Sequence, residues 1–149
     1  MNIGFKRTRP EATIPTFGHN DRTNAGMDFY SCEDISIYPK TAVVVDTGIA
    51  WDGMPLVTNN EKPVLVIQSR SGLSVNHSIE ACNAGVIDAG YTGSIRVKLY
   101  NNSEVPFKII KGDRIAQGIV YMLPVVTPVE IQEIGETIRG DKGFGSSGR

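Results

Sequence analysis

Short runs of apolar residues that alternate with polar ones recur along the chain, and few of them are long enough for a helix. In residues 25–31, Met27 and Phe29 alternate with Asp28 and Tyr30, which is the pattern of a strand with one buried face. This pattern predicts a strand in which Asp28 lies on the less buried face. The same reasoning predicts further strands over residues 3–7, 35–38, 42–45, 48–51, 64–68, 86–87, 95–99, 107–110, 114–122 and 125–131.

Two of the predicted strands, 86–87 and 95–99, flank a glycine-rich segment and together suggest a β-hairpin. Gly90 and Gly93 in that segment permit the tight backbone that a residue with a Cβ resists. Asp88 stands near the predicted bend, where its carboxylate can be held rigidly at the edge of the solvent. On this segment alone, Asp88 is better explained as a turn aspartate, which is common in β proteins, and only the rest of the chain favours a functional carboxylate.

Residues 71–78 are the only plausible helical segment of the sequence, and they follow the strand predicted over 64–68. Arg70 and Ser71 stand at the junction between the two. A guanidinium offers paired donors, and the first residues of a helix have N–H groups without acceptors inside the helix, so this junction can bind an oxyanion. The alternative is an N-cap serine beside a surface arginine.

Two residues of the predicted strands need particular surroundings. Gln117 lies in strand 114–122 on a face that is otherwise largely apolar. If it is buried, its amide needs a hydrogen-bond partner from the protein, water or a ligand. Trp51, in strand 48–51, is expected in the core or at a contact between subunits.

Composition narrows the class of protein. The chain is 40% hydrophobic and 21% charged with a formal net charge of −1, as in an ordinary single globular domain. Neither nucleic acid nor an acidic membrane is expected as a partner, and any anion site must be built locally. Sixteen glycines, eight prolines and many β-branched residues favour an all-β domain of short strands.

The sequence gives no indication of a zinc site or of a secretion signal. Cys32 and Cys82 show no metal-binding spacing, and His19 and His77 are too few for a zinc site. Residues 1–10 lack the pattern of a signal peptide, and no apolar run reaches the roughly 18 residues of a membrane span. A cytoplasmic protein with reduced thiols is therefore expected.

Five segments stand in a fixed order, and the set closely resembles the five motifs of the homotrimeric dUTPase family. They are AGMD (25–28), RSGLS (70–74), GVIDAGY (85–91), KGDRIAQ (111–117) and RGDKGFGSSG (139–148). The resemblance implies a β jelly roll of the β-clip type with one short helix over residues 1–138, and a mobile C-terminal lid over 139–149. It also implies a homotrimer whose three active sites are shared between subunits.

The resemblance further implies hydrolysis of dUTP to dUMP and pyrophosphate, which keeps uracil out of DNA and supplies dUMP for thymidylate synthesis. Asp88 corresponds to the general base, which deprotonates the water that attacks the α-phosphorus. Tyr91 corresponds to the ring that packs on the deoxyribose and leaves no room for a 2′-hydroxyl. The hairpin segment expected to contact uracil comprises Asn83, Gly85, Val86 and Ile87.

Other motif residues correspond to groups around the triphosphate. Arg70, Ser71 and Gly72 resemble the segment that contacts the phosphates from a neighbouring subunit. Gln117 resembles the glutamine that hydrogen-bonds near the α-phosphate and the attacking water. Mg²⁺ is expected on the three phosphates and water, and Asp28 resembles the outer-shell carboxylate that orients those waters.

The tail motif corresponds to a lid over the bound nucleotide. Four glycines and two serines surround Phe144 in residues 139–149, a composition that cannot form a core by itself. Arg139 and Ser146 resemble the groups that contact the γ-phosphate. Phe144 resembles the ring that stacks over uracil, with Gly145 as the substrate contact beside it. Without the resemblance, a disordered chain end explains this composition equally well.

Several positions depart from the family pattern. Ser69 replaces a frequent proline, and Gly90 replaces an acidic residue that is common before the tyrosine. Cys82 stands where many members have asparagine, and Asn83 comes one residue later, which puts contact between its side chain and uracil in doubt. Residues 52–63 resemble a family-variable loop.

Two alternatives to a simple dUTPase remain. The first is a dCTP deaminase, alone or combined with dUTPase activity, but that chemistry needs a glutamate where alignment places Lys98. The second is a non-catalytic regulatory trimer with the same fold. The retained Asp88, Gln117 and tail motif argue against this second alternative.

Overall fold

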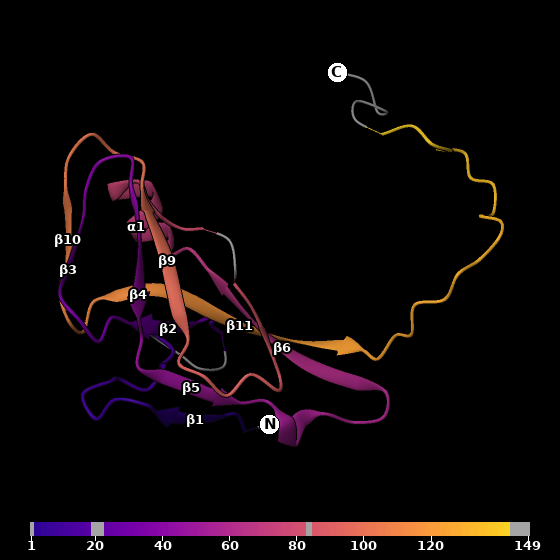
Figure 1. Ribbon diagram of the computed structural model, residues 1–149, viewed down its shortest axis with the longest axis horizontal. Helices are drawn as coiled ribbons and strands as arrows, with labels where there is room; N and C mark the ends of the chain where they lie inside the picture. Colours follow the sequence, from indigo (N-terminus) through magenta and orange to yellow (C-terminus); the bar gives the residue numbers. More distant parts are fainter. Residues whose placement is uncertain (1, 19–22, 83–84, 144–149) are drawn as a thin grey trace.

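The computed structural model describes residues 2–18, 23–82 and 85–143, and short strands make up nearly all of its regular structure (Figure 1). This described part also holds one turn of 3₁₀ helix, η1 (Met54–Leu56), and one short α-helix, α1 (Ser71–His77). The strands are β1 (Gly4–Arg7), β2 (Met27–Tyr30), β3 (Ile35–Ile37), β4 (Ala42–Asp46), β5 (Ile49–Asp52), β6 (Glu61–Gln68), β7 (Ile79–Ala81), β8 (Val86–Asp88), β9 (Arg96–Asn101), β10 (Phe107–Ile109) and β11 (Arg114–Pro124).

The strands form antiparallel sheets that enclose a single core. A four-stranded sheet has the order β2–β11–β6–β8 and a three-stranded sheet the order β4–β9–β7, while β1 pairs with β5 and β10 with β3. Phe29 from β2, Leu65 from β6 and Leu99 from β9 are completely buried where the sheets face each other. The molecule therefore has the predicted all-β, jelly-roll-like fold with one short helix.

Strand β9 shows how the alternation of the sequence positions functional side chains. Val97 and Leu99 point into the core, whereas Arg96 and Lys98 are exposed. The last residue, Asn101, is buried, and its amide donates to the backbone oxygens of Ile37 at 2.9 Å and Val105 at 2.8 Å. A satisfied polar group thus fixes the end of β9, and two cationic side chains project from its outer face.

Most of the predicted elements are confirmed within a few residues. The helix predicted over 71–78 is α1, and the strands predicted over 42–45 and 114–122 extend slightly further, as β4 and β11. Trp51 is in the core, with 3% of its surface exposed. The short strand β7 was not predicted, because three residues after a helix are too few to show a period.

The predicted hairpin of strands 86–87 and 95–99 is wrong. β8 instead pairs with β6, where Val86 lies opposite Val66, and β9 pairs with β4 and β7. The connection from β8 to β9 is too long for a tight hairpin loop. The buried Ile95 anchors the end of this connection on β5 by donating its N–H to the backbone oxygen of Ile49 at 2.7 Å.

The strand predicted over 125–131 is also absent. Strand β11 ends at Pro124, opposite Glu61 at the start of β6, so the chain offers no further partner strand on that side. The last contact there is the hydrogen bond from the Val125 N–H to the Asn60 oxygen at 2.8 Å. Residues 125–143 then run away from the sheets as an extended segment without helix or strand (Figure 1).

Both cysteines are free thiols. Cys32 is buried and donates to the Asp46 backbone oxygen at 3.0 Å. Burial, together with the negative charge of Asp46, raises the pKa of the Cys32 thiol, so this thiol stays neutral. Within residues 2–18, 23–82 and 85–143, no helix is long and apolar enough to cross a membrane.

Candidate active site

Asp28 forms the centre of a charged cluster between β2, β11 and the start of α1. Its Oδ1 accepts from Arg70 Nε at 2.8 Å, and its Oδ2 accepts from Arg114 Nη1 at 3.4 Å. Arg70 Nη1 also donates to the Arg114 backbone oxygen at 3.2 Å. Asp28 is only 6% exposed, so it is buried, although the face of β2 that it shares with the half-buried Tyr30 is the less buried one, as predicted. The two guanidinium groups explain how a carboxylate tolerates this burial.

This cluster forms one wall of a cavity of about 370 Å³. Gln117 lines the same cavity, half-buried, together with Arg70 and Arg114. A Cβ added to Gly26 would lie 2.8 Å from Gln117 Oε1, so the glutamine amide packs directly on the Gly26 backbone. Two guanidinium groups and an amide around one hollow provide the donors that a phosphate chain requires.

The residues that follow Arg70 lie at the rim of this site. Arg70 is the N-cap residue of α1 and Ser71 is the first helical residue, so the alternative of an N-cap serine is wrong. Ser71 and Gly72 are exposed, and an added Cβ on Gly72 would meet nothing within 4 Å. This segment is therefore open to a ligand.

A second cavity, of about 220 Å³, surrounds Asp88. Val86, Ile87 and Tyr91 line it, and the Asp88 side chain is exposed at the end of β8. The backbone oxygen of Asp88 accepts from the Tyr91 N–H at 3.0 Å, which closes a tight turn. The carboxylate and the aromatic ring predicted to act on one nucleotide thus lie on the same turn.

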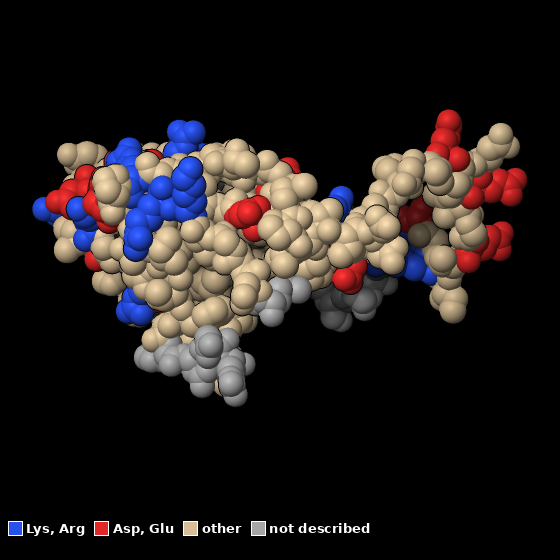
Figure 2. All heavy atoms as spheres, turned by 90° about the horizontal axis from the view of Figure 1, so that it is seen from below, with Lys and Arg blue, Asp and Glu red and all other residues tan. Residues whose placement is uncertain are grey.

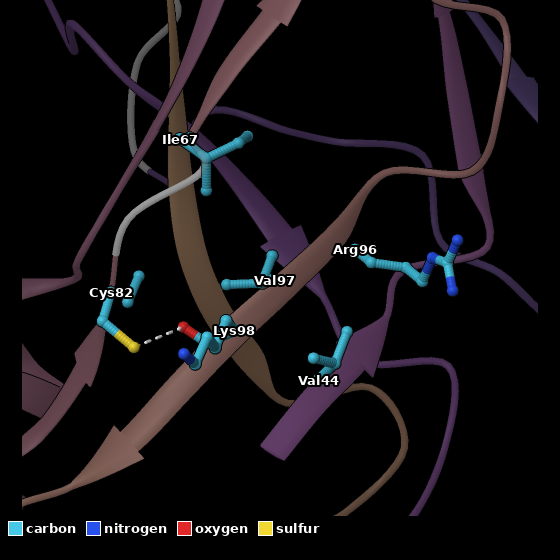
Figure 3. A pocket seen from close by; sticks show the side chains of 8 residues that line it. Val44, Ile67, Cys82, Arg96, Val97 and Lys98 are labelled. Carbon is cyan, nitrogen blue, oxygen red and sulfur yellow. Dashed lines mark hydrogen bonds between the residues drawn. The ribbon is translucent and has the colours of Figure 1, made fainter. Parts of the chain in front are cut away.

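A third cavity, of about 200 Å³ and mainly apolar, adjoins the second because both include Arg96 (Figure 3). It lies between β9 and the chain that enters β8, and Val44, Ile67 and Cys82 form its walls. Cys82 Sγ contacts the Lys98 backbone oxygen at 3.6 Å. Its size suits a single planar base. No carboxylate is found among the described residues that line it.

Gly85 closes the inner side of the third cavity. Its backbone oxygen accepts from the Ile67 N–H at 2.7 Å, and an added Cβ would lie 2.3 Å from the Ile67 oxygen. We predict that Gly85→Ala separates the start of β8 from β6, lowers the unfolding free energy by about 1–3 kcal/mol and weakens nucleotide binding. Thermal unfolding and calorimetric titration measure both effects.

Gly90→Ala is the matched control, because a Cβ at Gly90 meets nothing within 4 Å in the same segment. Equal melting temperatures for the two variants would show that the contact between Gly85 and Ile67 does not limit the structure.

The described residues form no group of three His, Cys, Asp or Glu side chains that could hold a metal ion. The carboxylate nearest to the phosphate-sized cavity, Asp28, already accepts from two guanidinium groups. A single carboxylate that is already paired fits an ion that keeps its water and is held mainly by a bound phosphate chain. It does not fit an ion that the protein alone must hold.

Some predicted site residues lie apart from these cavities or outside the described residues. Arg139 is exposed on the extended C-terminal segment, where its Nε donates to the Lys142 oxygen at 3.0 Å. Asn83, Phe144, Gly145 and Ser146 are outside the described residues.

The structure adds Arg114 and Trp51 to the predicted residues. Arg114 binds Asp28, and the Trp51 indole donates to the Asp88 oxygen at 3.1 Å. Arg114 lies in the KGDRIAQ segment at the start of a largely apolar strand, and this position could have indicated that it belongs to the site. Nothing in the sequence around Trp51 indicates its contact.

A hollow with two arginines, and an exposed carboxylate beside a base-sized cavity, are groups suited to an enzyme that hydrolyses nucleotides. A family model described as dUTPase matches residues 11–148. The chain is 39% identical over 150 residues to the deoxyuridine 5′-triphosphate nucleotidohydrolase of Solibacter usitatus, covering 100% of this chain and 97% of that protein. It is 36% identical over 148 residues to the Clostridioides difficile protein of the same name, covering 99% and 98%.

A solved mutant dUTPase of Staphylococcus bacteriophage 80alpha, with dUpNHpp, has the same fold. Its TM-score is 0.82 at 27% identity, with 99% of both chains covered. The chain therefore belongs to the dUTPase family. It is a dUTP diphosphatase, which hydrolyses dUTP to dUMP and pyrophosphate.

Proposed function

We propose that Asp88 is the general base of this hydrolysis. Its exposed carboxylate, on a turn closed by hydrogen bonds to its own backbone oxygen, is the observation that carries the proposal. Asp88 accepts a proton from the water that attacks the α-phosphorus, and pyrophosphate leaves. A fixed carboxylate suits this step, because phosphoryl transfer depends mainly on positioning and on stabilisation of charge.

Uracil occupies the apolar third cavity in this proposal, and the deoxyribose occupies the cavity around Asp88. The backbone of Gly85, Val86 and Ile87 faces the nucleoside, and the Tyr91 ring packs on the sugar and excludes a 2′-hydroxyl. Asn83 contributes through its backbone. The absence of a carboxylate from the described walls of the third cavity disfavours a deaminase, because Lys98 cannot transfer protons as a glutamate does.

The triphosphate occupies the cavity of Arg70, Arg114 and Gln117. Arg70, Ser71 and Gly72 bind the phosphate oxygens, and the Gln117 amide contacts the α-phosphate and the attacking water. If Mg²⁺ entered with the triphosphate, Asp28 would be the residue that orients its waters, and the ion would supply neutralisation of the phosphate charge. The guanidinium groups of Arg70 and Arg114 orient the phosphate chain.

The enzyme acts as a homotrimer, in which neighbouring chains complete each site. Asp88 lies opposite Val64, and the chain from there to Arg70 spans six residues, or about 20 Å at 3.3 Å per residue. The cavity around Asp88 and the cavity around Arg70 have no lining residue in common. This separation along β6 supports a site to which two chains contribute, one with Asp88 and the other with Arg70.

The extended segment after β11 supports assembly as well. Val126, Val129 and Ile134 are exposed on it, and a single chain leaves this apolar surface in water. Figure 2 shows acidic side chains gathered on this segment, whereas lysines and arginines cluster on the body of the molecule. Docking on a neighbouring chain would bury the apolar residues and bring opposite charges together.

Residues 139–149 form a lid separate from the jelly roll of residues 1–138. Arg139 and Ser146 contact the terminal phosphate, and Phe144 stacks over uracil with Gly145 as the substrate contact beside it. Closure of this lid excludes water and aligns the phosphates. The protein acts in the cytoplasm without a nucleic-acid or membrane partner.

A nucleotide panel tests this substrate assignment. Pyrophosphate release with Mg²⁺ should be rapid from dUTP and at least about 100-fold slower from dTTP, dCTP and UTP, because the cavities exclude a methyl, a changed base edge and a 2′-hydroxyl. Ammonia release from dCTP is measured in parallel. Comparable pyrophosphate release from UTP would refute the role of Tyr91, and ammonia from dCTP would establish a deaminase.

A further inference from the structure

Trp51 links the core to the turn that contains Asp88. It is the single tryptophan of the chain and is 3% exposed. Its Nε1–H donates to the Asp88 backbone oxygen at 3.1 Å, and the same oxygen accepts from the Tyr91 N–H at 3.0 Å. One carbonyl group therefore joins the proposed base, the proposed sugar-contacting ring and a buried side chain.

The indole is also packed tightly against this turn. A Cβ added to Gly53 would lie 2.8 Å from Trp51 Cη2 and 2.9 Å from Ala89 Cα, so these three residues are in close contact. Trp51 is further fixed by β5, where it lies opposite Phe5 of β1. The turn after Asp88 thus rests on a side chain that has no room to move.

The other end of the same segment is fixed through a separate set of hydrogen bonds. The Tyr91 hydroxyl donates to the Ser94 backbone oxygen at 3.1 Å, and Ser94 Oγ donates to Asp46 Oδ1. Asp46 in turn pairs with Arg9 at 3.4 Å. The segment from Asp88 to Ser94 is thus fixed at both ends, and only the contact with Trp51 is adjacent to the Asp88 carboxylate.

We propose that Trp51 is a positioning residue for hydrolysis: its indole N–H sets the orientation of Asp88 toward the attacking water. Trp51 touches neither the nucleotide nor the water and acts through the Asp88 backbone. The proposal rests on the assignment of Asp88 as the general base. Its physical basis is that a misplacement of about 1 Å at a catalytic group lowers a rate about 100-fold.

Removal of the N–H alone is the decisive test. Because the chain has one tryptophan, its benzothiophene analogue, with sulfur in place of N–H, changes position 51 only. We expect kcat to fall about five- to fifty-fold while KM for dUTP and the affinity for dUpNHpp stay within about threefold. Trp51→Phe also removes the N–H donor, so it should likewise lower kcat and leave KM for dUTP little changed.

Two comparisons separate this proposal from its alternatives. Phe5→Leu reduces packing beside Trp51 without touching the turn, so it should lower the melting temperature and leave kcat within about twofold. In an Asp88→Asn background the analogue should change the residual rate less than about twofold, since its effect passes through the base. An unchanged kcat with the analogue, or an equal loss in both backgrounds, would overturn the positioning role. If Asp88→Asn alone keeps the parent rate, it is the base assignment that fails.

Discussion

Asp88→Asn is expected to lower kcat about 10²- to 10⁴-fold while the affinity for dUpNHpp stays close to that of the parent enzyme. The substitution keeps the shape of the side chain and both hydrogen bonds to its backbone oxygen. It removes the group that we propose accepts the proton from water. Pre-steady-state pyrophosphate release and calorimetric titration measure the rate and the affinity separately.

Asp34→Asn is the matched control for this charge change. Asp34 accepts from the Lys111 N–H at 2.7 Å, and an asparagine oxygen can accept the same bond. This variant should keep the parent rate. A parent-like rate in Asp88→Asn would mean that another group deprotonates the water, and a loss of dUpNHpp binding would mean that Asp88 is needed for binding.

Deletion of residues 139–149 is expected to lower kcat/KM for dUTP about 100-fold or more, while the proposed trimer persists in sedimentation analysis. The body of the protein is expected to keep its core without this segment, because every buried residue in the described part of the chain precedes residue 139. The deletion removes Arg139 and the tail that we propose covers the nucleotide, so water should enter and the phosphates should lose alignment.

Phe144→Ala in the full-length chain refines this deletion. It should weaken nucleotide binding and slow turnover, though less than the full deletion does, because the groups on the terminal phosphate remain. A monomer after the deletion would instead assign residues 139–149 to assembly. Parent activity after the deletion would exclude a lid.

Local patterns were sufficient for most of the fold and failed where pairing depended on distant segments. The alternation around Phe29 and in β9 predicted both strands correctly, although only β9 has one buried and one exposed face. The partner of β8 could not be inferred, because the long connection to β9 lets β8 lie beside β6 instead. Residues 125–131 have strand-like composition but no neighbouring strand within their own chain.

In the candidate site, too, single residues were predicted from local sequence, whereas contacts between distant residues were not. Arg70, Gln117 and Asp28 were predicted as separate contributors to phosphate and metal binding, and the structure places all three around one cavity. The burial of Asp28 was missed, because an alternating pattern gives no sign that two arginines will neutralise a carboxylate. The contact of Trp51 with Asp88 was also missed, since it joins residues that are far apart in the sequence.

The ion pairs of Asp28 have a consequence for the thermodynamics of ligand capture. Asp28 pairs with Arg70 and Arg114 before any anion binds. The two side chains therefore lose little further rotamer freedom when they bind a phosphate. Immobilising a long flexible side chain costs about 0.5–1.5 kcal/mol. Because Arg70 and Arg114 are already ordered in the folded protein, most of this cost does not arise again on binding. Association with a polyphosphate should therefore show a smaller entropic penalty than it would at arginines that are free in solution.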